Sequence, residues 1–280
     1  MSALITLTTD FGLEDGYVGT MKGVILGINP RAVIVDLCHE IAPQNVREAA
    51  YVLYTAYRYF PPRTVHVVVV DPGVGSERRA IALRTRQAVF VAPDNGVLSY
   101  IAAQEEILGI VHLTNARYWL AEVSSTFHGR DIFAPVAGHL SRGVPFSELG
   151  QPIHDIVLLP LSQPESHPDG TLGGHILHVD RFGNCITDVR AEHLPPDGPP
   201  TVEVAGRRIM GVRPTYAVGE EGHLLALISS EGYLEIAVRG GSAAQALGAK
   251  AGDEVIVRPG EGRREGSNPG RLNADLWGKL

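Results

Sequence analysis

Hydrophobic residues in the first half of the chain alternate between short continuous runs and runs at helical spacing. Continuous apolar runs bounded by turn residues are typical of buried strands, and repeats every three to four residues are typical of helices. Strands are predicted over residues 4–9, 32–37 and 65–70, with a paired extension over 81–83 and 88–91, and helices over 17–26, 45–59 and 129–140. Strands alternating with helices form a mostly parallel sheet covered on both faces. The fold class predicted for residues 1–160 is therefore a mostly parallel α/β sandwich domain.

The pattern changes after about residue 160. Residues 161–173 are dense in proline, glycine and polar side chains, which is typical of a linker between domains. Beyond them, turns separate short extended runs over residues 174–179, 201–204, 224–228, 233–238 and 254–258. This spacing predicts a smaller domain over residues 174–258, either a β-barrel or a sandwich. The polar, glycine-rich residues 259–280 are predicted to form a flexible tail.

Composition limits the class of protein. Of the 280 residues, 44% are hydrophobic and 20% are charged, which is enough for a substantial core and argues against disorder. The formal net charge of −7, with scattered basic residues, argues against nucleic acid as the main partner. No apolar run has the length of a membrane span, and the N-terminus lacks a basic region typical of signal peptides, so a cytoplasmic protein is expected. Cys38 and Cys185 do not have the spacing of a metal site.

The most informative segment is VHVVVVDPGVGSERR, over residues 65–79. Its four consecutive valines suit a strand covered on both faces, and Asp71 follows where that strand would end. Ligands of open α/β sheets gather outside the carboxyl ends of the strands, and a glycine turn lets the backbone approach such a ligand. A carboxylate beside the guanidinium of Arg78 stays ionised and well oriented. The alternative is a structural ion pair that ties down the turn.

Three further residues of the first half are candidates. His128, among small and polar residues, is of a type that titrates near neutrality, so it is a catalytic candidate; a capping or core histidine is the alternative. Asp10 ends the first predicted strand, where an acid in a dinucleotide fold binds sugar hydroxyls; a cap or turn aspartate is the alternative. Asn95 lies in Asp94-Asn95-Gly96, which has the composition of a turn.

The second half carries two polar turns of interest. Asp180, Phe182 and Asn184 lie between two predicted strands, where an aromatic ring beside polar side chains is suited to a nucleobase. From the residues alone, a simple hairpin turn is the favoured interpretation. Ser230 and Glu231 lie in a similar turn, which is suited to the polar end of a ligand.

Six blocks of the sequence, taken in order, resemble a known family. They are LTTDFG, VVDPGVGSERR, APDNGVL, STFHGRDIFAP, DRFGN and SSEGYLEIA, and the resemblance extends from residue 4 to about residue 257. They resemble the S-adenosyl-L-methionine (SAM) hydroxide adenosyltransferases, or SAM hydrolases, which are relatives of the fluorinase and chlorinase enzymes. The resemblance implies an N-terminal α/β domain and a C-terminal β-barrel domain. It also implies a homotrimer, with active sites between the N-terminal domain of one subunit and the C-terminal domain of its neighbour.

The resemblance further implies an activity, which is attack of activated water on ribose C5′ of SAM to give adenosine and L-methionine. SAM is then the substrate, and no metal or other cofactor is expected. By position, Asp71, Arg78 and His128 match the family's water-activating acid, arginine and histidine. The positions that match substrate-binding residues are Asp10 at the ribose hydroxyls, Asn95 in the lining, Asp180, Phe182 and Asn184 around the adenine and the amino-acid end, and Ser230 and Glu231 at the methionine moiety.

Two alternatives to the hydrolase stay open. A halide-using SAM adenosyltransferase is disfavoured because the chain has Asp71 to Arg78 where fluorinase-like enzymes have a small polar and aromatic halide pocket. An anionic Asp71 would repel a halide, and the chain also lacks the fluorinase insertion before the block at residues 92–98. A non-enzymatic adenosine- or SAM-binding protein would need only the binding positions, so the joint presence of Asp71, Arg78 and His128 counts against it.

Overall fold

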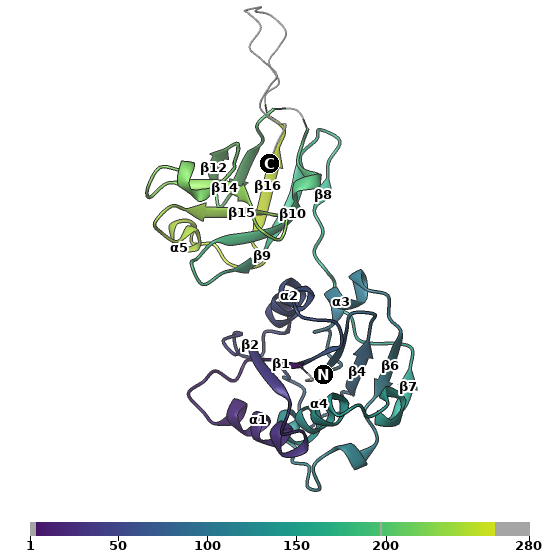
Figure 1. The fold of residues 1–280 in the computed structure, drawn as a ribbon. Coiled ribbons are helices and arrows are strands. Elements are labelled where there is room, and N and C mark those ends of the chain that lie inside the picture. The colour runs from purple at the N-terminus through teal and green to yellow at the C-terminus, as the bar shows by residue number, and fades with distance from the viewer. Residues whose placement is uncertain (1–3, 197, 261–280) are drawn as a thin grey trace, which may run out of the picture. The chain divides into compact units, whose positions relative to one another are not determined.

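The computed structural model describes residues 4–196 and 198–260. The chain divides into two compact units, Met1–Leu161 and Ser162–Leu280. The first unit is a sheet between helices, and the second is a nearly closed, barrel-like sheet (Figure 1), which confirms the predicted fold class. Of the tail predicted over 259–280, residues 261–280 lie outside the described residues.

The sheet of the first unit has the strand order β2-β1-β3-β5-β4-β6-β7. Strands β2, β1, β3 and β5 run parallel, whereas β4, β6 and β7 pair antiparallel with their neighbours. The expected parallel arrangement therefore applies to one half of the sheet, and the predicted paired extension is confirmed as the β4–β5 ladder. The strands are β1 Leu4–Thr9, β2 Val33–Cys38, β3 Thr64–Val69, β4 Ala80–Arg84, β5 Ala88–Pro93, β6 Gly109–His112 and β7 Gln151–Ile153.

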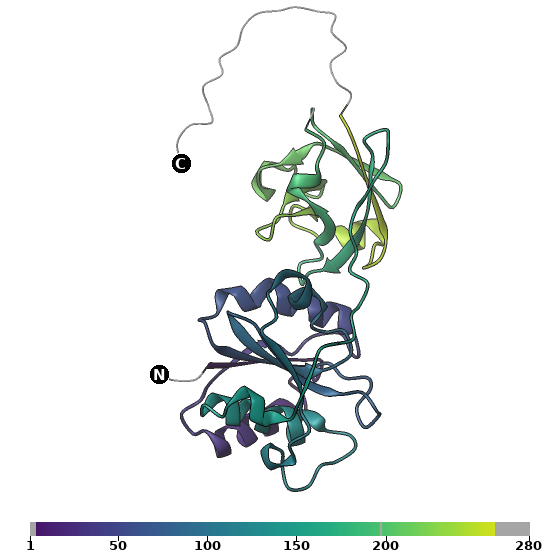
Figure 2. The ribbon, with the colours of Figure 1, turned by 90° about the vertical axis from the view of Figure 1, so that its right-hand side faces the viewer.

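Helices cover both faces of this sheet, as the sequence predicts (Figure 2). Helices α1 and α4 pack together on one face, and α2 and α3 pack together on the other. Asn45 caps α2 as predicted, because its side chain accepts the backbone N–H of Glu48 at 3.2 Å. The helices are α1 Tyr17–Ile28, α2 Val46–Ala56, α3 Ser99–Gln104 and α4 Ala134–Ser141, with a π-helix at Gly129–Phe133 and 3₁₀ turns at Tyr57–Tyr59, Ala116–Tyr118 and Phe146–Leu149.

The sheet of the second unit has the order β12-β11-β16-β9-β10-β15-β14-β13, with β8 paired to β9. It curls around buried aliphatic side chains such as Ile176, Val202 and Leu234. Part of the segment predicted as a linker is thus strand, since β8 and the start of β9 fall within residues 161–173. The strands are β8 Glu165–Ser166, β9 Leu172–Val179, β10 Cys185–Arg190, β11 Thr201–Val204, β12 Arg207–Met210, β13 Val212–Arg213, β14 Leu224–Ile228, β15 Tyr233–Val238 and β16 Glu254–Arg258, and the helical segments are α5 Ala243–Leu247 and the 3₁₀ turns Ala191–His193 and Tyr216–Val218.

The parallel pair β1–β3 places two candidate acids at one edge of the first sheet. Thr9 lies opposite Val69 in the ladder, so both strands end at the same edge. Strand β3 is buried along its whole length, as its run of valines predicts. The segments that leave this edge carry Asp10 after β1 and Asp71 after β3. This is the edge at which open α/β sheets bind their ligands.

Candidate active site

Asp71, Arg78 and His128 are brought together by the structure. Arg78 Nε donates to Asp71 Oδ1 at 2.9 Å, and Arg78 Nη2 donates to Oδ2 of the same carboxylate. Nη2 also lies 2.8 Å from His128 Nδ1, although 50 positions separate these residues in the chain. The side chains of Arg78 and Asp71 are only 10% and 5% exposed. A bidentate pair of this kind fixes the orientation of both the guanidinium and the carboxylate.

Arg78 also determines the state of His128. A guanidinium can only donate hydrogen bonds, so Nδ1 of His128 accepts, and the proton of the neutral ring resides on Nε2. Burial and the positive charge of Arg78 lower the pKa of His128 below its usual 6.5, outweighing the carboxylates of Asp71 and Asp131. His128 is therefore neutral at pH 7.

A glycine turn holds Asp71 and Arg78 against the segment that carries His128. Gly75 has a φ of +76°, in the left-handed region that favours glycine. A Cβ atom at Gly75 would lie 2.3 Å from the carbonyl oxygen of Ser125. The backbone of the turn can therefore approach Ser125 only because residue 75 has no side chain.

A buried acid holds the His128 segment from its other side. Asp131 is 0% exposed, accepts the backbone N–H of Ser124 at 2.8 Å, and pairs with the guanidinium of Arg130. Burial would raise the pKa of Asp131, but hydrogen bonds from Arg130 and Ser124 outweigh it and leave that pKa below its usual value. His128 itself directly precedes the π-helix Gly129–Phe133, an irregularity that is frequent at functional sites.

Asp71 and His128 line a cavity of about 390 Å³ in the first unit. Its size is in the range of small-molecule sites. Asp10 lines it as well, and Oδ2 of Asp10 accepts the backbone N–H of Gln44 at 2.8 Å. Gln44, also in the wall, has a φ of 65°, a strained conformation for a residue with a side chain. Two carboxylates and one imidazole thus border the same cavity.

Aromatic residues that the sequence analysis did not single out form part of the cavity wall. The rings of Phe11, Tyr17 and Phe127 pack on one another, with centroids 5.3 to 5.7 Å apart, and all three line the cavity. An apolar wall beside carboxylates suits a ligand with an apolar body and polar groups. The available sequence signal is adjacency, because Phe11 follows Asp10 and Phe127 precedes His128.

The side chain of Asn95 is hydrogen-bonded to the backbone next to Asp71 and within its own turn. Asn95 Nδ2 donates to the carbonyl of Val70 at 2.9 Å, and Oδ1 accepts the N–H of Val97 at 3.2 Å. The first of these bonds holds Val70, which lies between the end of β3 and Asp71. The predicted turn around Asn95 is confirmed, and the residues that line the cavity do not include it.

The candidates of the second unit lie in two turns. Asp180 Oδ1 accepts the N–H groups of Phe182 and Asn184 at 2.9 and 2.8 Å, and Oδ2 accepts the side-chain amide of Asn184 at 3.0 Å. This confirms the hairpin turn, between β9 and β10, and it displays the Phe182 side chain at 76% exposure. Ser230 and Glu231 lie in the turn between β14 and β15, where Ser230 Oγ is 3.4 Å from Glu231 Oε1.

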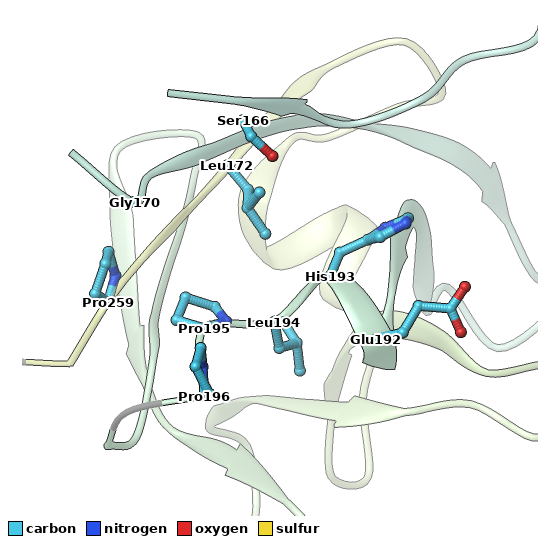
Figure 3. A pocket seen from close by; sticks show the side chains of 9 residues that line it. All are labelled: Ser166, Gly170, Leu172, Glu192, His193, Leu194, Pro195, Pro196 and Pro259. Carbon is cyan, nitrogen blue, oxygen red and sulfur yellow. The ribbon is translucent and has the colours of Figure 1, made fainter. Parts of the chain in front are cut away.

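A second pocket, of about 440 Å³, lies in the C-terminal unit (Figure 3). Its wall is mostly apolar and includes Leu172, Leu194 and Pro259, with Glu192 and His193 as its ionisable members. None of the candidate residues predicted from the sequence lines it. Convergent ionisable groups mark an active site better than volume does, so the candidate site is the cavity of the first unit.

The described residues contain neither a candidate metal-binding cluster nor a helix suited to crossing a membrane. In residues 4–196 and 198–260, no group of three or more histidine, cysteine, aspartate or glutamate side chains could hold a metal ion. Within the same ranges, every helix is too short or too polar to cross a membrane.

The sequences of known proteins match most of this chain. Residues 5–150 match the model of the SAM hydroxide adenosyltransferase N-terminal domain, and residues 174–256 match that of the C-terminal domain. An (R)-S-adenosyl-L-methionine hydrolase from Salinispora tropica is 40% identical over 259 residues, covering 91% of this chain and 98% of the relative. A fluorinase from Actinoplanes sp. is 29% identical over 288 residues, covering 91% of this chain and 97% of the relative.

A solved structure shows the same fold. The crystal structure of a conserved protein from Thermotoga maritima superposes with a TM-score of 0.85 at 40% identity, covering 91% of this chain and 99% of that one. The two matched domains together span most of the chain, in the order that the six sequence blocks predict. The chain belongs to the SAM hydroxide adenosyltransferase family.

Proposed function

We propose that the protein hydrolyses S-adenosyl-L-methionine to adenosine and L-methionine. The observation that carries the proposal is the cluster of Asp71, Arg78 and His128 beside the cavity. A carboxylate held by a guanidinium and placed near a neutral imidazole is suited to orient water and to accept its proton. The relative from Salinispora tropica named as a SAM hydrolase, at 40% identity over nearly its whole length, supports the same reaction.

The reaction is a displacement at ribose C5′. The oxygen of water attacks C5′ in line with the C5′–S bond, and the electron pair of that bond leaves with sulfur, which becomes the neutral thioether of methionine. A sulfonium is a good leaving group, so orienting and deprotonating the water is the difficult part. Asp71 accepts the proton of the attacking water and releases it to solvent. Arg78 holds the Asp71 carboxylate in place, and His128 orients the attacking water or relays its proton.

Residues of the N-terminal domain and residues of the C-terminal domain both take part in substrate binding in this proposal. Asp10 holds the ribose hydroxyls at the edge of the first sheet, and the negative charges of Asp10 and Asp71 favour a cationic sulfonium. The turn with Asp180, Phe182 and Asn184 holds the adenine and the amino-acid end, with Ser230 and Glu231 at the methionine moiety. In this proposal the protein is a cytoplasmic homotrimer whose sites each combine an N-terminal and a C-terminal domain from neighbouring subunits, and it needs no metal or other cofactor. The exposed ring of Phe182 supports a role in contacting a ligand or another chain.

Product analysis tests the proposed reaction. Purified protein is incubated with SAM in halide-free buffer, and the mixture is separated by liquid chromatography. Adenosine and methionine are expected in equal amounts, and added chloride should not change the products. Formation of 5′-chloro-5′-deoxyadenosine would instead support a halide-using adenosyltransferase. Tight binding of SAM without release of methionine would support a binding protein.

The pH dependence of turnover should reveal the protonation of His128. Its pKa lies below 6.5, so His128 is neutral above that pH and becomes a cation beside Arg78 only as the pH falls through the lowered value. Protonation also removes the Nδ1 acceptor for Arg78. We therefore expect kcat/KM to be level near pH 7 and to decline on the acid side of 6.5. In His128→Gln this acid limb should shift or vanish; an identical limb in both proteins would assign it to another group.

A further inference from the structure

A second group of interacting side chains lies behind the cavity wall, outside the Asp71 cluster. His39, directly after β2, is 4% exposed, and its Nδ1 is 2.9 Å from the hydroxyl of Thr9 at the end of β1. His39 Nε2 lies at an ion-pair distance of 3.1 Å from Asp36 Oδ1. Asp36 is in turn paired with Lys22 of α1, with Nζ 2.6 Å from Oδ2. A carboxylate, an imidazole and a hydroxyl thus lie next to one another in that order, although His39 Nε2 has no hydrogen-bond partner among the described residues.

This order of groups is the one that activates a hydroxyl nucleophile in hydrolases, but Thr9 does not fit that role. Thr9 is 0% exposed, so a substrate cannot reach its oxygen. That oxygen also accepts the backbone N–H of Phe11 at 3.2 Å. Thr9 therefore links His39 to the backbone of the next two residues, Asp10 and Phe11, and both of these line the cavity.

Two more hydrogen bonds join the same two segments. The carbonyl of His39 accepts the N–H of Gly12 at 2.8 Å, and the N–H of Gln44 donates to Asp10 Oδ2 at 2.8 Å. The segment after β2 is thus hydrogen-bonded to both ends of the turn over residues 9–12 and to the carboxylate of Asp10 within it. Among these three contacts, the His39–Thr9 bond joins two side chains, and neither of these residues lines the cavity.

We infer that His39 is a positioning residue for substrate binding, which acts through Thr9 to hold the Asp10 carboxylate and the Phe11 ring in the cavity wall. The inference rests on the proposed function, in which Asp10 binds the ribose. The Asp71 cluster makes no bond to His39 among those described. Loss of His39 should therefore weaken binding of the nucleoside more than it slows the chemical step.

Steady-state kinetics on His39→Leu and Thr9→Val test this inference. Leucine removes both ring nitrogens, and valine replaces the threonine hydroxyl by a methyl group of similar size. Each change should raise KM for SAM about tenfold, with kcat within about threefold of wild type. The double variant should show little further increase, because both substitutions break one linkage. His39→Asn, which keeps a polar atom near the position of Nδ1, should recover part of the lost affinity.

The chain offers a matched control, a buried histidine whose threonine partner lies on β1 as Thr9 does. His66 is 0% exposed and its Nδ1 is 2.8 Å from the hydroxyl of Thr6, so this pair repeats the buried histidine–threonine bond. His66 packs against Phe90 rather than the cavity wall. His66→Leu should therefore leave KM unchanged, whatever it does to the melting temperature. A merely structural role for His39 would give the same result in His39→Leu.

Calorimetric titration with adenosine separates this inference from the proposed function. The dissociation constant for adenosine should rise about tenfold in folded His39→Leu and Thr9→Val. If wild type binds adenosine and hydrolyses SAM while both variants keep the wild-type KM and affinity, the role of His39 is overturned alone. If wild type neither binds adenosine nor releases methionine, the proposed function fails and the inference fails with it.

Discussion

Replacing Asp71 by asparagine is expected to lower kcat for SAM hydrolysis by about 10²- to 10⁴-fold, which is the usual contribution of a positioned general base. Asparagine has nearly the same shape but cannot take up the proton of the attacking water. Its amide NH₂ would also face a donor of Arg78, because Arg78 donates to both oxygens of the carboxylate. KM should rise much less than kcat falls, because the ribose and adenine contacts are made elsewhere and only the attraction of Asp71 for the sulfonium is lost. Initial rates of methionine release over a range of SAM concentrations measure both constants.

Glu77→Gln is a suitable control for Asp71→Asn. Glu77 lies in the same turn, is exposed, and does not line the cavity. The substitution removes one negative charge near the site without touching the bonds of Arg78, so kcat should stay within about twofold of wild type. If Asp71→Asn retained the wild-type kcat, Asp71 would have no part in the mechanism. If both variants lost turnover equally, the net charge of the turn would matter rather than a base.

The strand that presents Asp71 was predictable because its signal is local. Four valines in a row indicate a buried strand. An acid directly after such a strand lies at its carboxyl end, which is the edge where open α/β sheets bind ligands. The cap of α2 was predictable for the same reason, since Asn45 needs only the N–H of Glu48 three residues later. The direction of β4, β6 and β7 was not, because apolar runs of this length carry no sign of parallel or antiparallel pairing.

The meeting of Arg78 with His128 was beyond any local signal. The two residues are 50 positions apart, and the resemblance to a family was the main reason to place them in one site. Asn95 stays a predicted lining residue of the substrate site. Its side chain is engaged with the carbonyl of Val70 at the end of β3, so position in a matching block identified its neighbourhood but not its partner. The role of His39 has no sequence signal, because Thr9 and His39 meet through the packing of β1 beside β2.

Replacing Gly75 by alanine should lower kcat/KM by about 100-fold, although residue 75 contributes no side chain to the cavity. Alanine at a φ of +76° carries a backbone cost of about 1–2 kcal/mol. In addition, its Cβ would lie 2.3 Å from the Ser125 carbonyl oxygen, so the turn and the His128 segment must move apart. A displacement of about 1 Å between catalytic groups is enough to cost about 100-fold in rate. Steady-state kinetics and thermal unfolding of the same preparation measure the two effects.

Gly143→Ala separates the backbone cost from the steric one. Gly143 has a φ of +89°, and a Cβ atom there would meet nothing within 4 Å. It lies just after α4 and outside the cavity wall, so its alanine variant should lose about 1–2 kcal/mol of stability and keep the wild-type kcat/KM. If Gly75→Ala behaved in the same way, losing stability but not turnover, the close approach to Ser125 would not be needed to set the distance from Arg78 to His128. Loss of turnover in Gly75→Ala alone would show that the active-site geometry depends on the absence of a side chain at residue 75.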